Sequence, residues 1–419
     1  MSRSLLDQAA AFSFLLLAAA LPWSIAPISI AVVLCGVLTL AAWWSPGGQR
    51  WQRTPVDLPA LGWIAALAIA SVFALEPARA FPRVTKGLLL AIVPVAAYHA
   101  RDPKILKRAI VALLISAVPA TVYALVRFAH DGGVFPARVK GLVGHALTYG
   151  GQATLLATVA MALVARGPRR WKIGAAAFLL LLAPALIGSY TRSAWIATLV
   201  AGAVILGRLR ARFLPILAGA AVLALFLLPQ HYRERALSAF DTHSVWNVER
   251  LYMWDAGARM FRDHPLTGVG IQDLSGLYRR YRVPQATEDH GHLHNVVVQV
   301  GATMGVVGLA ALTWLLIGLF RTAGHRWGAP LPRGDLASAV RLAAVAGLVA
   351  FLVAGMFEWN LGDEELLDFL CVLVGLGFAA SSSAAGLEAG SARSRAGVPS
   401  VDAPPRGARS DPSISVAPG

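Results

Sequence analysis

Long apolar runs, separated by shorter polar connections, fill most of the chain. A helix that crosses a membrane needs about 20 mostly apolar residues, and twelve runs come close to this length or exceed it. The pattern therefore predicts twelve transmembrane helices, at residues 5–22, 26–44, 58–75, 84–100, 106–129, 147–165, 171–188, 193–207, 212–229, 293–320, 336–357 and 366–383.

The composition agrees with this pattern. Of the 419 residues, 57% are hydrophobic and only 14% are charged, and the mean hydropathy is +0.62. So little polar surface could not enclose a water-soluble protein of this size, and the predicted fold class is an all-α polytopic membrane protein. Arg3 and the apolar stretch after it would also suit a cleaved signal peptide, but we interpret this stretch as a retained first span.

The formal net charge of +15 could indicate a nucleic-acid partner, but the basic residues do not form one patch. They fall in short clusters in every second connection, which is the positive-inside pattern of membrane proteins. This pattern predicts cytoplasmic N- and C-termini and no nucleic-acid binding. The basic connections carry Arg50 and Arg53, then Arg101, Lys104, Lys107 and Arg108, then Arg166, Arg169, Arg170 and Lys172, then Arg208, Arg210 and Arg212, then Arg321, Arg326 and Arg333.

One connection on the other, outer side is much longer than the rest. Residues 230–292 alternate charged and aromatic side chains, which predicts a small cap over the outer end of the helices. The remaining predicted units are helices 1–9 in residues 1–229, helices 10–12 in residues 293–383, and a cytoplasmic tail in residues 384–419. The tail is rich in Ser, Ala, Gly, Pro and Arg, a composition typical of disorder.

The cap contains one amphipathic pattern, in the sequence ERLYMWDAGARMFRDHP, which predicts a helix that ends before Pro265. The following LTGVGIQ predicts a glycine turn. Outside a strand-to-helix context its Gly-x-Gly is weak evidence for nucleotide binding. The apolar face predicted for the helix consists of Leu251, Trp254, Ala258 and Phe261.

Several basic residues lie on the outer side, where the charge rule does not require them. Arginine presents a planar fork that suits phosphate oxygens, so several converging from different connections would make a diphosphate clamp. Alternatively, some extend to lipid headgroups or pair with carboxylates such as Glu76 and Asp131. Arg192 has the least freedom to do so, because it lies in a tight turn. The outer basic residues are Arg79, Arg83, Lys86, Arg138, Lys140, Arg192 and Arg250.

Titratable residues gather in TEDHGHLHN, residues 287–295, just before an apolar run. In an extended chain His290, His292 and His294 would share a side and, together with Asp289, could hold a metal ion. If the segment is already helical, only one histidine points into the bundle. His294 is then the best candidate for a general base, because it is the deepest and adjoins Asn295. An interfacial histidine bonded to a backbone carbonyl is the other interpretation.

Two further segments accompany this cluster on the outer side. The turn FEWNLGDEELLD places Glu358 and other acidic residues opposite the arginines, where they could pair with an arginine, orient a histidine or keep the turn hydrated. The apolar run after the histidines carries Gly301, Gly305 and Gly308, a small-residue face that predicts close packing between helices. The segment 138–151 places His145 and Tyr149 between glycines at a membrane entry.

These features resemble the O-antigen ligases, which form part of a larger group with the O-antigen polymerases and the bacterial pilin-type oligosaccharyltransferases. His294, Asn295, Gly305 and Gly308 match the family signature in type and spacing. The cap sequence from Arg250 to the His-Pro-Leu-x-Gly-x-Gly ending looks like the family's cap segment. SYTRSAW is similar to the family's Ser-Arg-small turn.

The resemblance implies a GT-C-type glycosyltransferase that moves a polysaccharide from undecaprenyl diphosphate to a lipid A core sugar. The reaction would take place on the periplasmic side of the bacterial inner membrane, with inversion, and without nucleotide, metal or other cofactor. His294 would be the base, and Arg192 and Arg250 would contact the diphosphate. Topology adds Arg138, Lys140, Arg79 and Arg83 to the diphosphate site. The surroundings of the base comprise Asn295, which belongs to the signature, and His292, His290 and Glu358, which do not.

Other functions stay open at this point. A polymerase or a protein oligosaccharyltransferase would use the same lipid-linked donor. A transporter or flippase for anionic lipids would also need arginines within the membrane, although the ionisable residues cluster at one face rather than along a path.

Overall fold

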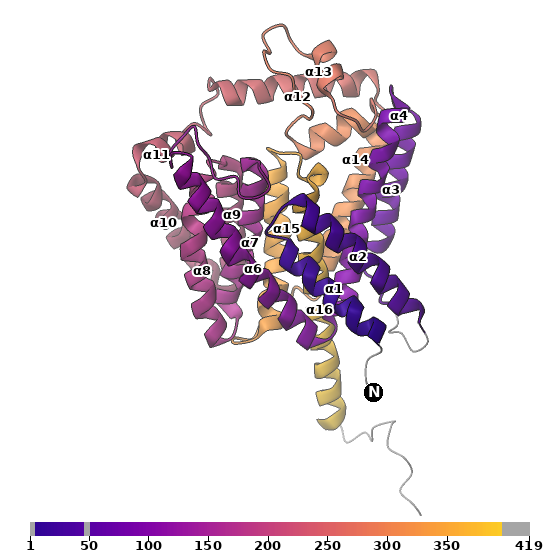
Figure 1. The fold of residues 1–419 in the computed structure, drawn as a ribbon, viewed down its shortest axis with the longest axis vertical. Coiled ribbons are helices and arrows are strands. Elements are labelled where there is room, and N and C mark those ends of the chain that lie inside the picture. The colour runs from indigo at the N-terminus through magenta and orange to yellow at the C-terminus, as the bar shows by residue number, and fades with distance from the viewer. Residues whose placement is uncertain (1–4, 46–50, 396–419) are drawn as a thin grey trace, which may run out of the picture.

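A computed structural model describes residues 5–45 and 51–395, and in these ranges it contains helices and no strand (Figure 1). Each predicted transmembrane segment coincides with a helix. The bundle is built from α1 (Leu5–Ala20), α2 (Ile25–Trp44), α3 (Asp57–Val72), α4 (Pro77–Ala80) continued by the 3₁₀ helix η1 (Phe81–Ala91) and α5 (Ile92–Ala100), α6 (Pro103–His130), α7 (Ala146–Arg166), α8 (Arg169–Gly188), α9 (Arg192–Arg210), η2 (Ala211–Phe213), α10 (Leu214–Leu227), α14 (Val296–Ala323), α15 (Leu336–Gly355) and α16 (Glu364–Arg395).

Within the described ranges, nine helical runs are long and apolar enough to cross a membrane. One of them, Arg192–Leu227, joins α9 and α10, and one, Pro77–Ala100, joins α4, η1 and α5. Helices α1 and α3 are also apolar but shorter. The predicted fold class, a polytopic all-α membrane protein, is therefore confirmed.

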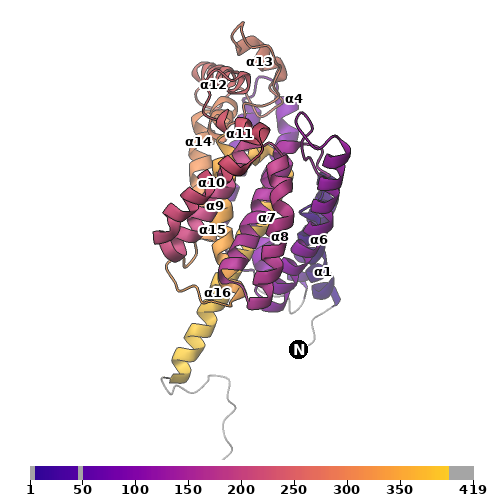
Figure 2. The ribbon, with the colours of Figure 1, turned by 90° about the vertical axis from the view of Figure 1, so that its left-hand side faces the viewer.

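The connections separate to the two ends of the bundle (Figures 1 and 2). At one end lies the cap, with α11 (Gln230–Leu237), α12 (Val245–Asp263) and α13 (Ser275–Tyr281). At the other end, three of the connections predicted to be basic contact one another. There, Arg208 donates to the Trp327 carbonyl at 2.9 Å, and the backbone N–H of Asp335 donates to the Arg166 carbonyl at 3.0 Å.

Helix α16 is the centre of the bundle and packs between α5 and α15. Two glycines permit this close approach: a Cβ at Gly375 would collide with the Val93 carbonyl, and one at Gly377 would collide with Ala344. The helix runs on to Arg395, into the segment predicted to be disordered, because its alanine-rich sequence favours a helix. The remainder of that segment, 396–419, lies outside the described residues.

Helix α12 is the amphipathic helix predicted in the cap, and it ends before Pro265 as expected. The predicted apolar face was wrong, however, since Leu251 and Ala258 are exposed. A different stripe of the helix, which includes Met253 and Met260, is buried in the core of the cap. The sequence could not decide between the two, because α12 carries apolar residues on more than one side.

Helix α14 is broken at Gly305, whose φ of +61° is left-handed. The cap segment 265–270 lies against the break: Val306 N–H donates to the Pro265 carbonyl at 2.8 Å, and Val269 N–H donates to the Ala302 carbonyl at 2.9 Å. A Cβ at Gly305 would collide with Leu266. The glycine expected to pack helices in one continuous span instead bends the chain and anchors the cap.

Candidate active site

The sequence around His294 starts α14 in a defined geometry. Asn295 is the N-cap, and its Oδ1 accepts from Val297 N at 2.9 Å and Val298 N at 3.0 Å. Its Nδ2 donates to the Met356 carbonyl at 2.9 Å, which fixes the start of α14 to the end of α15. His294 itself has a left-handed φ of +47°, a conformation that non-glycine residues adopt rarely and often at functional sites.

Glu358, in the connection between α15 and α16, holds both the histidine and an arginine. His294 Nδ1 lies 2.8 Å from Glu358 Oε2, and Arg250 Nη2 donates to Glu358 Oε1 at 3.0 Å. Only 10% of the Glu358 side chain is exposed. An ionised carboxylate can only accept, so Nδ1 of His294 is the donor in this contact. Nε2 is then the ring nitrogen through which a neutral His294 would act as a base.

The other two histidines surround His294. The ring of His292 is 4.1 Å from that of His294, and the ring of His290 is 5.9 Å away. Burial, and then the neighbouring His294, lower the pKa of His292 to about 4 and also lower the pKa of His290. Both rings are therefore neutral near pH 7. No group of three or more His, Cys, Asp or Glu side chains in the described part of the chain is arranged to hold a metal ion.

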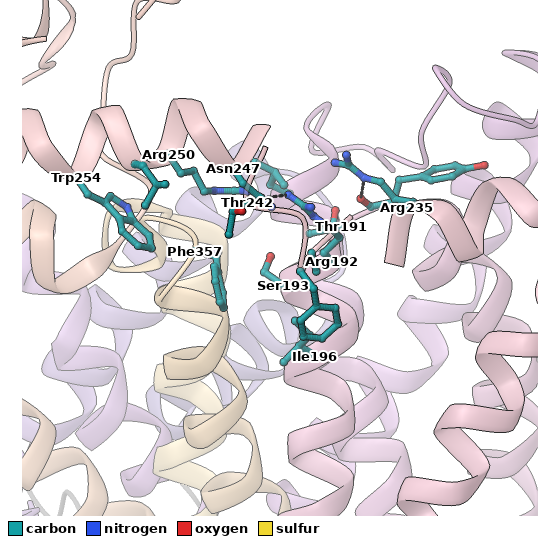
Figure 3. Close-up of a pocket in the computed structure, with 15 residues that line it drawn as sticks. Thr191, Arg192, Ser193, Ile196, Arg235, Thr242, Asn247, Arg250, Trp254 and Phe357 are labelled. Atoms are coloured by element: carbon teal, nitrogen blue, oxygen red, sulfur yellow. Dashed lines mark hydrogen bonds between the residues drawn. The ribbon is translucent and has the colours of Figure 1, made fainter. Parts of the chain in front are cut away.

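A cavity of about 290 Å³ opens between the start of α9 and the cap, and three arginines line it (Figure 3). Arg192 Nη1 donates to the Ser238 carbonyl at 2.6 Å, and its Nη2 donates to Asn247 Oδ1 at 2.8 Å. Arg235 donates to the Tyr190 carbonyl at 3.3 Å. Arg250 extends from α12 (Figure 3) and pairs with Glu358 at 3.0 Å. We refer to this space as the arginine cavity.

The arginine cavity carries positive charge that is only partly compensated, by the pair of Arg250 with Glu358. In the described part of the chain, no carboxylate lies within ion-pair distance of Arg192 or Arg235. Behind the cavity wall, Arg138 donates to the Ser189 carbonyl at 2.8 Å and to Thr191 Oγ1 at 3.0 Å. Burial and the nearby Arg235 lower the pKa of Arg138 to about 10. Such a cluster favours an anion with several oxygens.

Not every basic residue predicted for the diphosphate site lies at the arginine cavity. Arg79 is 74% exposed and pairs with Glu76 at 2.7 Å. Lys140 is exposed, and Arg83 lines a different cavity. Conversely, sequence reasoning missed Arg235, because it lies among other charged residues of the cap and belongs to no motif.

The sequence leaves three roles open for Glu358: to pair with an arginine, to orient a histidine or to keep the turn hydrated. In the structure it contacts both Arg250 and His294. His145, before α7, borders a smaller cavity together with His292 and Glu358. Burial lowers the pKa of His145.

Fold and site together define a polytopic helical membrane protein in which a histidine–carboxylate pair is linked to an arginine-lined cavity. A family model described as O-antigen ligase matches residues 176–313, the stretch that runs from α8 through the cap into α14. It includes Arg192, Arg235, Arg250 and His294. The resemblance noted in the sequence is thus confirmed over this stretch, and it supports a function of ligase or polymerase type in general. No curated protein shows significant similarity to the chain.

Proposed function

We propose that this protein is a glycosyltransferase that moves a polysaccharide from undecaprenyl diphosphate to a sugar of the lipid A core. We assign the cap to the periplasmic side of a bacterial inner membrane, as the distribution of basic residues predicts. One observation carries the proposal: Glu358 links His294, a base, to Arg250, a wall of the arginine cavity. A base and an anion site in direct connection are the two parts that this transfer requires.

The donor diphosphate is assigned to the arginine cavity. Arg192, Arg235 and Arg250 supply charge without a full set of carboxylate partners, and Arg138 adds to the positive field from behind. The same cavity is lined by apolar side chains such as Ile196 and Phe357. The polyprenyl chain can therefore stay in the bilayer while the diphosphate is held among the arginines.

The chemical step is a direct displacement. Nε2 of His294 removes the proton from the acceptor hydroxyl, whose oxygen attacks the anomeric carbon of the donor sugar. The bond from that carbon to the diphosphate oxygen breaks, and its electron pair leaves with the diphosphate. The arginines stabilise the charge that grows there. Glu358 stabilises the imidazolium that forms, and the configuration at the anomeric carbon is inverted.

The test is transfer in liposomes that contain the purified protein, labelled polysaccharide on undecaprenyl diphosphate, and lipid A core. We expect the label to move to the lipid A core, and His294→Ala to lower the rate on the order of a hundredfold or more. His243→Ala, which changes a cap histidine that is 96% exposed, is the control and should remain active. Label on a second lipid-linked chain would indicate a polymerase, and label on protein an oligosaccharyltransferase. Lipid flipping without transfer would indicate a transporter.

A further inference from the structure

A second cavity, of about 200 Å³, is separate from the arginine cavity. Its walls come from α3, η1, α14, the start of α16 and the cap loop 271–273. It shares no lining residue with the arginine cavity. His292 borders it and also borders the smaller cavity that reaches Glu358. The second cavity therefore lies near His294 and Glu358 but is distinct from the arginine cavity.

The second cavity contains buried polar atoms without partners. Gln272 is only 3% exposed, yet neither its amide oxygen nor its amide nitrogen has a hydrogen-bond partner among the described residues. The buried Nδ1 of His292 is unpartnered in the same sense. Buried polar groups are normally satisfied, so this set indicates a missing polar ligand. A sugar hydroxyl both donates and accepts, and could therefore satisfy the amide and the imidazole together.

Two other features of the second cavity indicate the chemical class of its ligand. Trp63 and Trp359 contribute aromatic surface of the kind on which sugar rings pack. Arg83 and Lys86 supply positive charge. Lys86 pairs with Glu364 at 2.8 Å, whereas no carboxylate in the described part of the chain lies within ion-pair distance of Arg83. The carboxylate of Asp273 also lines this cavity, but it forms no ion pair with Arg83 among the described residues. Arg83 is thus the cation that can meet an anionic group on the ligand.

We propose that the second cavity binds the acceptor glycolipid, by a sugar that carries a phosphate near the hydroxyl to be glycosylated. This inference rests on the proposed function. It adds that donor and acceptor bind in two separate cavities. The donor occupies the arginine cavity and the acceptor occupies the second cavity. His294 lies against His292, which borders the second cavity, and is linked to the arginine cavity through Glu358 and Arg250. Gln272 and His292 bind the sugar hydroxyls, and Arg83 binds the phosphate.

The experiment compares three variants in the liposome assay, with acceptor and donor each titrated while the other is saturating. Gln272→Leu keeps the size of the side chain and removes both hydrogen-bonding atoms. Arg83→Ala removes the cation, and Arg79→Ala is the matched control, a nearby arginine that is paired with Glu76 outside the cavity. We expect Gln272→Leu and Arg83→Ala to raise the KM for the acceptor about tenfold and to leave the KM for the donor unchanged. Arg79→Ala should behave as the wild type.

A dephosphorylated lipid A core gives an independent check. With this acceptor Arg83→Ala should no longer differ from the wild type, whereas Gln272→Leu should still raise the KM. A raised KM for the donor alone would assign the cavity to the donor, and no change in either KM would exclude it as a substrate site.

Failure of the proposed function looks different from failure of this inference, because the wild type would then not transfer to lipid A core at all. In that case, binding of labelled lipid A core to the purified wild type, to Gln272→Leu and to Arg79→Ala decides the inference. Weaker binding by Gln272→Leu alone supports acceptor binding in the second cavity. Equal binding by all three proteins contradicts it.

Discussion

His294 Nδ1 and Glu358 Oε2 lie 2.8 Å apart, although 64 positions separate the two residues in the chain. Glu358 also binds Arg250 through its other oxygen. One carboxylate therefore sets the orientation of the imidazole and the position of one wall of the arginine cavity. In the proposed reaction, a change at this carboxylate affects proton removal and diphosphate binding together.

Glu358→Gln should lower kcat on the order of a hundredfold. The amide has nearly the same size, but it is neutral and can present its NH₂ group to Nδ1, which favours the wrong tautomer of His294. Initial rates at saturating substrates measure the effect. Glu76→Gln is the control, because it removes the same charge from a pair with Arg79 away from the site. A rate close to that of the wild type for Glu358→Gln would remove the pair from the mechanism.

Arg192→Lys should lower the transfer rate by roughly a hundredfold. The guanidinium bonds Ser238 and Asn247 of the cap through separate nitrogens, and an ammonium group cannot reproduce this fork while it faces a phosphate. Arg210→Lys, at the opposite end of the same helix, is the matched control and should keep full activity. If both variants transfer normally, the diphosphate does not bind at Arg192.

The bundle could be predicted because the length and polarity of a transmembrane segment are local properties of the sequence. Each apolar run became a helix, and basic connections came together at the end opposite the cap. Topology also placed Glu358 on the same face as His294 and the arginines. It could not show that this one acidic residue would reach both His294 and Arg250, because that contact depends on the packing of α14 against α15.

The sequence did not predict features that depend on where a residue lies around the axis of the helix bundle. Arg83 and Arg192 were expected in one clamp because both lie at the cap end, yet they line different cavities. Arg235 resembles Arg233, two positions earlier, in every local property. The small-residue pattern around Gly305 predicts helix packing, but such a pattern does not reveal a left-handed φ.

Gly305→Ala should lower the free energy of unfolding by about 2 kcal/mol or more, because a side chain is strained at positive φ and would collide with Leu266. Since the break anchors the cap, activity should fall as well. Thermal unfolding in detergent measures the stability. Gly36→Ala in α2 is the control, since a Cβ there meets nothing within 4 Å and alanine favours a helix over glycine. Equal melting temperatures for Gly305→Ala and the wild type would contradict the role of the break.

His292 should make the stability of the protein depend on pH in a defined window. Its pKa falls from an ordinary 6.5 to about 4 in the folded protein, so the unfolded chain binds a proton more readily than the folded one. The contribution of His292 to the free energy of unfolding is then fully present above pH 6.5 and decreases as the pH falls from 6.5 towards 4. Below pH 4 this contribution no longer changes with pH. His292→Gln should flatten this part of the profile of unfolding midpoint against pH, whereas His243→Gln, at an exposed position, should not. A wild-type midpoint that rises on acidification through the window, or a His292→Gln profile identical to that of the wild type, would show that the imidazole is not held neutral by burial.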